Sequence, residues 1–310
     1  MRTAFIDTLL NIAEQDERVW LLTADLGFSV LEKFIERFPD RYVNVGVAEQ
    51  NMIGIAAGLA STGIKPYLYS IANFPTLRCL EQIRNDICYH ELDVKIVSVG
   101  GGLAYGSQGY THHGVEELGI LRMLPGMTVV APGDPVETRL ATQELNKHSG
   151  PGYLRLGKAN EPVLHENEPG FRLGQANVLR TGRDGCLIST GAMLGECLRV
   201  SDQVRQENGL EIRVVSMHTI KPLDETMLLK CVRELPWVMT VEEHSITGGL
   251  GAACSEVLAE AGNFRARFQR FGLPDRVNHT FGSQQFLRNL LMGDLLEEVQ
   301  LLCRARRLAA

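Results

Sequence analysis

Two short segments carry residue types that could do chemistry. In the first, Asn44–Gly54, a predicted strand ends and a predicted helix begins, so Glu49 stands near the helix N-terminus. Ligand crevices of open α/β sheets form just past the carboxyl ends of strands. Glu49 is therefore a candidate site carboxylate, although the same position also suits a glutamate that only complements the helix dipole.

The second segment is a glycine-rich loop, Gly106–Gly114, which contains the paired histidines His112 and His113 and follows three consecutive glycines, 100–102. Such a loop allows close approach by a ligand, and imidazoles can act as acid, base or hydrogen-bond donor. The alternative is a flexible loop with two exposed histidines. A metal site is disfavoured, because no further His, Asp or Glu stands at ligand spacing.

A third pair of segments, His218–Asp224 and Val241–Gly251, combines a proline, glycines and several polar residues. Their residue types would suit an anion site at a helix N-terminus, but a structural turn is the better interpretation. The chain has no GxxxxGK[ST] loop, and no GxGxxG motif follows its first predicted strand.

The elements that must position these residues alternate between short apolar runs and amphipathic stretches. The apolar runs are rich in Val, Ile and Leu, as expected for strands of a mainly parallel sheet covered on both faces. Strands are predicted at 19–23, 42–45, 66–71, 94–99, 128–131, 153–156, 186–189, 213–216, 238–241 and 265–270. Helices are predicted at 4–14, 49–61, 75–89, 115–124, 135–147, 195–207, 224–235, 250–261, 283–291 and 294–304.

This alternation breaks at Lys158–Phe171, which holds two prolines, three glutamates and little periodicity. We interpret the break as a connection between two consecutive α/β domains. The predicted division is a first domain over 1–160, a linker over 161–173 and a smaller second domain over 174–310.

Composition limits the class of protein. The 310 residues carry a formal net charge of -6, which argues against a nucleic-acid partner. The seven cysteines are scattered without a CxxC pair, as expected for reduced thiols in a cytoplasmic protein. The N-terminus is too polar for a signal peptide, and no apolar run is long enough to span a membrane.

The order of the motifs is more specific than any one of them. It resembles the C-terminal half of transketolase over essentially the whole chain, covering the pyrimidine-binding domain and the transketolase C-terminal domain. The motifs that carry this resemblance are Thr23–Leu26, Val45–Met52, Phe74 with Glu81–Asp86, Tyr110–Glu116, Val129–Asp134, Tyr153–Arg155, Ile220–Pro222 and Glu242–Gly251.

The resemblance implies a thiamine-diphosphate enzyme whose cofactor lies between two domains. In that family the other domain holds the diphosphate and Mg2+ through a Gly-Asp-Gly motif, which this chain lacks. The chain therefore resembles the small subunit of a split transketolase. The implied partner is an N-terminal-half subunit that binds diphosphate and Mg2+, in an α2β2 heterotetramer; no metal ligand is expected here.

The resemblance also implies roles at the cofactor. Glu49 matches the glutamate that hydrogen-bonds N1′ of the aminopyrimidine and favours its imino tautomer, so that the exocyclic nitrogen can take the proton from thiazolium C2. Phe74 matches the aromatic residue that stacks on the pyrimidine, and Ile71 and Leu77 occupy flanking positions. Asp25 matches an aspartate near the cofactor and the other domain.

For the substrate, His112 matches a channel histidine that helps proton transfers, and His113 stands beside it. Arg2, Ser29 and Arg155 match positions that bind substrate phosphate, for which a pair of guanidinium groups is well suited. Gly100 and Gln108 replace a histidine and an aspartate of the family. These departures leave open an unphosphorylated, deoxy or nucleotide-linked sugar.

The function implied is transfer of a two-carbon ketol unit from a ketose donor to an aldose acceptor. Deoxyxylulose-phosphate synthases and the β subunits of 2-oxoacid dehydrogenases share this domain pair and remain alternatives. A non-catalytic regulatory subunit with the same fold is a third interpretation.

Overall fold

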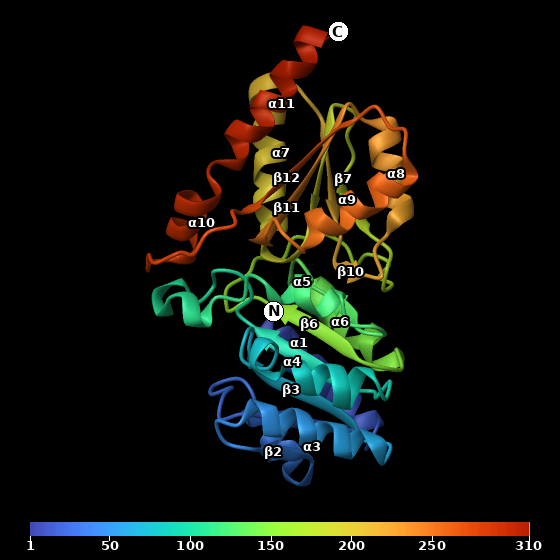
Figure 1. Ribbon diagram of the computed structural model, residues 1–310, viewed down its shortest axis with the longest axis vertical. Helices are drawn as coiled ribbons and strands as arrows, with labels where there is room; N and C mark the ends of the chain where they lie inside the picture. Colours follow the sequence, from blue (N-terminus) through green and yellow to red (C-terminus); the bar gives the residue numbers. More distant parts are fainter. Residues whose placement is uncertain (310) are drawn as a thin grey trace.

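The computed structural model describes the backbone of residues 1–309 and the side chains of residues 1–305. Two α/β domains are stacked along the long axis, with the N-terminus close to their junction (Figure 1). The first domain is built on a seven-stranded sheet in the order β10-β5-β6-β4-β3-β1-β2. Its strands are β1 (Val19–Thr23), β2 (Tyr42–Asn44), β3 (Lys65–Ile71), β4 (Lys95–Val99), β5 (Thr128–Val130), β6 (Gly152–Leu156) and β10 (Thr219–Lys221).

Every strand pair of this sheet is parallel except the one between β10 and β5. Alternate strand residues belong to different apolar clusters, which shows that helices cover both faces of the sheet. Leu68 and Ile96 pack on the face covered by α3, for example, whereas Tyr69 and Val97 pack on the face covered by α1. The helices are α1 (Arg2–Gln15), α2 (Glu32–Arg37), α3 (Glu49–Ser61), α4 (Leu80–Gln82), α5 (Glu117–Arg122) and α6 (Pro135–Lys147).

The second domain has a five-stranded sheet in the order β12-β11-β8-β9-β7, in which only the β7–β9 pair is antiparallel. Its strands are β7 (Asn177–Arg180), β8 (Gly185–Ser189), β9 (Ile212–Ser216), β11 (Trp237–Ser245) and β12 (Arg267–Leu273). Its helices are α7 (Leu194–Asn208), α8 (Glu225–Glu234), α9 (Leu250–Ala261), α10 (Gln284–Met292) and α11 (Leu295–Ala309). The prediction of two consecutive α/β domains with mainly parallel sheets is confirmed.

The sequence-based predictions missed three elements and described a fourth incorrectly. The edge strands β7 and β10 and the six-residue helix α2 were missed, because short elements carry too little periodicity. The helix predicted over 75–89 is instead a 3₁₀ turn η2 (Leu77–Cys79), a single α turn and a π-helical stretch η3 (Ile83–Cys88). Hydrogen bonds from Tyr89 N to Arg84 O and from Leu92 N to Ile87 O widen this segment.

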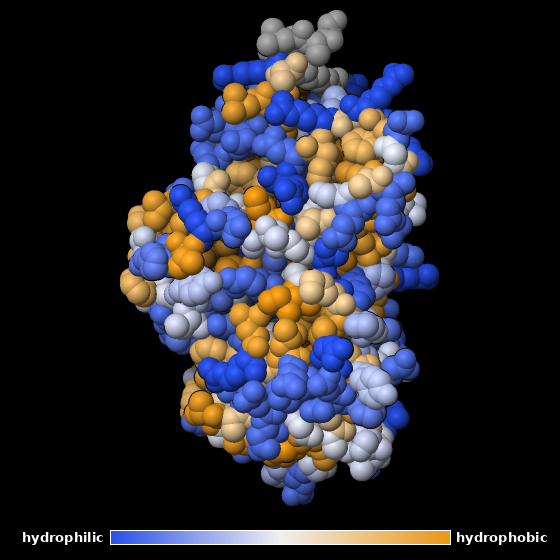
Figure 2. All heavy atoms as spheres, viewed as in Figure 1, coloured by the Kyte–Doolittle hydropathy of each residue, from blue (hydrophilic) through white to orange (hydrophobic). Residues whose placement is uncertain are grey.

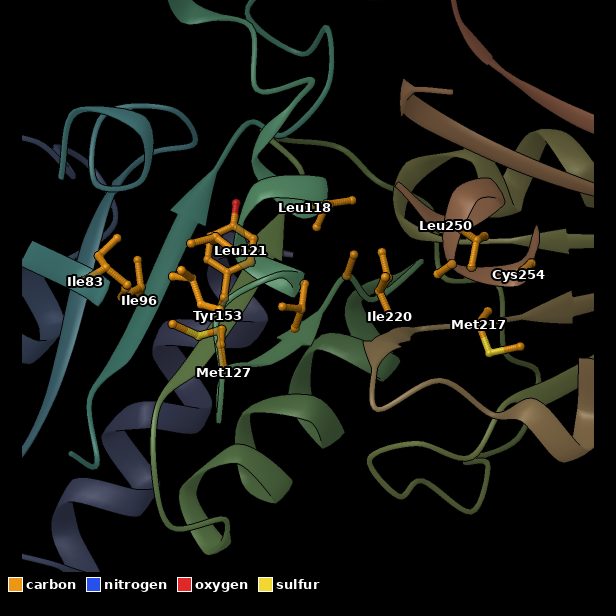
Figure 3. Packing of buried hydrophobic residues seen from close by; sticks show 14 of the residues in the cluster. Ile83, Ile96, Leu118, Leu121, Met127, Tyr153, Met217, Ile220, Leu250 and Cys254 are labelled. Atoms are coloured by element: carbon orange, nitrogen blue, oxygen red, sulfur yellow. The ribbon is translucent and has the colours of Figure 1, made fainter. Parts of the chain in front are cut away.

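The two domains share one apolar core. The largest cluster runs from Ile83 and Ile96 in the first domain to Leu250 and Cys254 in the second (Figure 3). Strand β10 lies in the second half of the chain and pairs with β5 of the first sheet. The ammonium group of Lys221, the last residue of β10, donates to the carbonyl oxygens of Arg122 and Leu124.

A buried carboxylate, Asp134, helps to hold the connection between the domains against the first domain. Asp134 is fully buried, and it caps α6 by accepting from Glu137 N at 2.7 Å. Its second oxygen accepts from the backbone amides of Leu164 and His165 at 2.8 and 3.2 Å. None of the described helices combines the length and the apolar character that crossing a lipid bilayer requires.

Replacing Asp134 with alanine should therefore destabilise the protein by about 3 kcal/mol, because one buried and two partly buried amides lose a charged acceptor. The control is Ser283→Ala, which removes an exposed cap from α10 and should cost about 1 kcal/mol. Denaturant unfolding of both variants measures the difference. Equal losses would contradict the role assigned to Asp134.

Candidate active site

The chemistry-bearing residues of the first domain follow the carboxyl ends of neighbouring parallel strands. Strand β1 ends opposite β2 and β3, with Thr23 in register with both Asn44 and Tyr69. Because parallel strands end at one edge of the sheet, the segments after β1, β2, β3 and β4 meet there. Asp25, Glu49, Phe74 and Gly100 all lie in those segments.

Glu49 is the first residue of α3, where the helix dipole favours a carboxylate. The residue is 1% exposed, and its Oε2 accepts from Nη1 of Arg78 at 2.6 Å. The Arg78 side chain is 47% exposed. A glutamate that only complemented a helix dipole would gain nothing from burial against an arginine, so this geometry favours the site interpretation of Glu49.

Arg78 connects Glu49 to the rest of the site. Its guanidinium carbon lies 4.9 Å from the centroid of the Phe74 ring. Phe74 in turn meets His112 edge to face, with centroids 5.1 Å apart. The structure thus brings Glu49, Phe74 and His112 together in a chain of contacts through a residue that the sequence analysis did not single out. Arg78 could have been noticed, since it follows Phe74 by four residues.

Ile71 and Leu77 flank Phe74 at the end of β3 and the start of η2. Ile71 is buried and Leu77 is half-buried, so they supply an apolar wall on that side. With a buried carboxylate, an aromatic ring and apolar neighbours, these residues fit an aminopyrimidine ring.

His112 ends the short helix η5 (Tyr110–His112), which follows η4 (Gly106–Gln108) in the glycine-rich loop. Its Nδ1 lies 3.0 Å from the Thr111 hydroxyl, and Asn73 donates to the Thr111 carbonyl at 2.6 Å. Burial lowers the pKa of His112, so the imidazole is neutral at pH 7 and can accept a proton. Gln108, at the end of η4, is exposed.

His113 does not join His112. It is 2% exposed, and it lines a separate cavity of about 150 Å³ between Tyr110 and the Pro274–Asn278 segment. Burial lowers the pKa of His113, while a hydrogen bond to the Gly106 carbonyl opposes that change. Paired in sequence, the two histidines therefore face different surroundings.

Asp25 and Ser29 occupy strained backbone on the loop after β1, with φ values of +53° and +61°. Asn44 holds Asp25 by accepting from its backbone amide at 3.0 Å. The Ser29 amide donates to Glu32 at 2.6 Å. Both Asp25 and Ser29 are exposed at the carboxyl edge of the sheet.

Two cations lie near Tyr105, at the end of the site away from Glu49. The Lys158 ammonium is 4.5 Å from the Tyr105 ring centroid, and that ring lies 6.3 Å from His112. Burial raises the pKa of Tyr105, and the Arg2 guanidinium opposes the rise. The sequence analysis missed Lys158. Its position two residues past the end of β6 could have indicated it, because site residues follow the carboxyl ends of parallel strands.

Arg155, which the sequence analysis expects to bind substrate phosphate, lies against a buried carboxylate. It is 6% exposed, and its Nε lies 2.9 Å from Oε1 of Glu117, which is fully buried. Its Nη2 donates to the backbone carbonyls of Gly114 and Glu243. In this structure the guanidinium is directed into the protein between the domains, and it is not brought together with Arg2 and Ser29.

Comparison with known proteins identifies the family of both domains. Family models described as transketolase, pyrimidine binding domain and transketolase, C-terminal domain match residues 1–162 and 174–292. The fold is that of a transketolase pyrimidine-binding domain followed by a transketolase C-terminal domain. The chain belongs to the transketolase family. The family implies dependence on thiamine diphosphate.

Among curated proteins, a putative transketolase C-terminal section from Methanocaldococcus jannaschii is 37% identical over 93% of this chain and 90% of its own length. One of the subunits of an apulose-4-phosphate transketolase from Phocaeicola vulgatus is 40% identical over 84% of this chain and 83% of its own. A 1-deoxy-D-xylulose-5-phosphate synthase from Microcystis aeruginosa is 34% identical, but this chain spans only 45% of it.

Among solved structures, a split-gene transketolase described as an inactive β4 tetramer superposes with a TM-score of 0.86 at 34% identity, covering 98% of this chain and 97% of the other. The chain is therefore related to split transketolases and to deoxyxylulose-phosphate synthase.

Within the part that the structure describes, no group of three or more His, Cys, Asp and Glu side chains is arranged to hold a metal ion. We therefore assign no step to a metal bound by this chain.

The position of Arg155 leads to a stability prediction. Replacing Arg155 with methionine leaves Glu117 buried without its cation and should destabilise the protein by about 3–5 kcal/mol. Arg2→Met, at a half-buried position, should cost less than about 1 kcal/mol. Denaturant unfolding measures the free energy of unfolding of both variants. An unchanged stability in Arg155→Met would show that the contact with Glu117 is not needed for folding, and Arg155 would then be free to bind substrate.

Proposed function

We propose that the chain is the pyrimidine-binding subunit of a split transketolase that transfers a two-carbon ketol unit from a ketose donor to an aldose acceptor. The observation that carries this proposal is the buried Glu49 carboxylate, linked through Arg78 to Phe74 and His112 at one edge of a parallel sheet. Bound thiamine diphosphate supplies the carbon–carbon chemistry.

Glu49 holds a proton at N1′ of the aminopyrimidine in this proposal. Its burial at a helix N-terminus keeps water away, so the shared proton is not lost to solvent. The half-exposed Arg78 is the displaceable partner that neutralises the carboxylate before the ring enters. Phe74, Ile71 and Leu77 orient the ring, and Asp25 faces the partner chain.

Proton transfers at the substrate hydroxyl are assigned to His112, because its neutral imidazole lies beside Phe74 and Tyr105. Arg2 and Lys158 near Tyr105 would bind an anionic far end of the substrate, with Ser29 on the neighbouring loop. This pair of cations supports a phosphorylated or otherwise acidic sugar. Gln108, exposed on the same loop, is available to a donor hydroxyl.

The partner is proposed to be an N-terminal-half subunit that binds the diphosphate and Mg2+, in an α2β2 assembly. Phe28 and Val47, on the loops after β1 and β2, are 77% and 76% exposed at the same edge as Glu49. Large apolar side chains left in solvent beside a site favour coverage by another protein. The related β4 tetramer is described as inactive, which supports a requirement for the second chain.

The first test is Glu49→Gln in the complex reconstituted with that partner. Ketol transfer should fall by about 100-fold or more, because glutamine cannot hold the N1′ proton. Turnover is measured by coupled assay with ketose donors at saturating cofactor, and Glu144→Gln, on the far end of α6, serves as control. Unchanged turnover in Glu49→Gln would favour a non-catalytic regulatory subunit.

A second test concerns the substrate's far end. Lys158→Met should raise the KM for a phosphorylated ketose by about tenfold while leaving the KM of its unphosphorylated counterpart nearly unchanged, since one charge-assisted contact is lost. Lys147→Met, at an exposed lysine outside the site, is the matched control. Equal effects on both donors would remove Lys158 from anion binding.

The same assay separates the alternatives within thiamine chemistry. A 2-oxo acid donor such as pyruvate, in place of a ketose, would identify a function like that of deoxyxylulose-phosphate synthase, which some relatives are named for.

A further inference from the structure

The loop that carries His112 is held at its base by side chains from both domains. Backbone hydrogen bonds between Gly102 and Gly114 close the loop into a narrow neck. Beyond the neck, η4 and η5 project from the first sheet beneath α10 (Figure 1). Asn73 holds the loop at the Thr111 carbonyl, next to His112. The two backbone hydrogen bonds of the neck alone would leave the base of the loop weakly held, so the position of His112 also depends on the side chains that contact the neck.

Glu243, near the end of β11 in the second domain, contacts one side of this neck. It is 3% exposed, and its Oε1 accepts from the backbone amide of Leu103 at 2.5 Å. A Cβ on Gly102 would lie 2.4 Å from the same oxygen, so a glycine is needed there to admit the carboxylate. The Gly102 φ of +69° also favours glycine.

Arg155, near the end of β6 in the first domain, contacts the other side of the neck. It donates to the Gly114 carbonyl and to the Glu243 backbone carbonyl. A Cβ on Gly101 would lie 2.0 Å from Arg155 Nε. The consecutive glycines therefore admit two charged side chains of opposite sign, one from each domain, against the two ends of a single loop.

Helix α10 completes the arrangement from outside. Arg288 pairs with Glu243, and Gln284 donates to both of its oxygens at 2.8 and 3.1 Å. The segment before α10 packs on the loop itself, since a Cβ on Gly109 would lie 2.1 Å from the Phe281 ring. Figure 2 shows apolar side chains gathered over α10, which includes the exposed Phe286 and Leu290.

We propose that Glu243, Arg155 and Arg288 are positioning residues that hold the neck of the Leu103–His113 loop and thereby fix His112 over the site. The proposal rests on the proposed function for the role of His112, but the restraint on the loop is independent of it. It assigns the second domain a task in the reaction, although none of that domain's described side chains takes part in the contacts that link Glu49 to His112.

Two variants test this proposal in the complete chain assembled with its partner. Glu243→Gln removes the charge that Arg288 binds, and Arg288→Gln removes the cation from the less buried side, should the first variant fail to fold. The control is Glu256→Gln, which breaks the ion pair with Arg122, another contact between the domains that does not touch the loop.

The first measurement is hydrogen exchange followed by mass spectrometry. Amides of the Leu103–His113 loop should exchange about tenfold faster or more in both variants, while β3 and β4 keep their protection. Glu256→Gln should leave loop exchange unchanged. Unchanged loop exchange in both variants, or equal acceleration in Glu256→Gln, would overturn the proposal.

The second measurement is kinetic. The kcat/KM for the ketose donor should fall by about tenfold, whereas the thiamine diphosphate concentration for half-maximal activity should change less than about twofold. Arg288→Lys, which keeps the charge, should recover part of the loss. A parallel rise in the cofactor requirement would overturn the proposal. If loop exchange is faster in the variants but the unmodified complex shows no ketol transfer, the proposed function is contradicted and the restraint on the loop is not.

Discussion

A carboxylate removed from water needs a positive group or hydrogen-bond donors beside it, and this requirement organises the molecule. Among the residues that the structure describes, five glutamates are almost completely buried. They are Glu49, Glu117, Glu137, Glu242 and Glu243. Each has its own partner, and the character of that partner separates structural carboxylates from the one proposed to act on a cofactor.

Four of the five are held by charged side chains that are at most 16% exposed or by backbone amides. Glu117 has Arg155, and Glu137 has His165, at side-chain exposures of 6% and 7%. Glu242 accepts from the amides of Leu250 and Gly251 at the start of α9, and burial nevertheless raises its pKa. Glu243 has Arg288, Gln284 and an amide of the loop neck. Among these five, Glu49 has the most exposed charged partner, the Arg78 side chain at 47%, so this partner can move aside without opening the core.

The fold could be predicted from the sequence wherever a buried face imposed a pattern. The boundaries of β1, α3, α6 and α9 agree with the predictions because each has a continuous apolar run or face with clear ends. Strand β10 could not be found in this way. It is three residues long, and it pairs with a strand about ninety residues earlier, so no local signal marks it.

The site was predictable to the extent that motif order identified residue types. Glu49, Phe74 and His112 were found through that order, and the structure brings them together. The role expected for Arg155 stays a prediction, because its type indicates charge but not direction, and only the fold shows that Glu117 faces it. Arg78 and Lys158 were missed since neither belongs to a recognised motif; each becomes visible when distances to Phe74 and Tyr105 are known.

Strand β10 also has a consequence for how this architecture can be rearranged. The edge of the first sheet beside β5 is covered by a strand that the chain adds only after it has entered the second domain. A gene fusion, a domain exchange or a truncation placed in the connecting segment would leave β5 as an open edge and divide a shared apolar core. The two domains therefore depend on each other structurally. Recombination between related genes is expected to exchange both domains together rather than one of them alone.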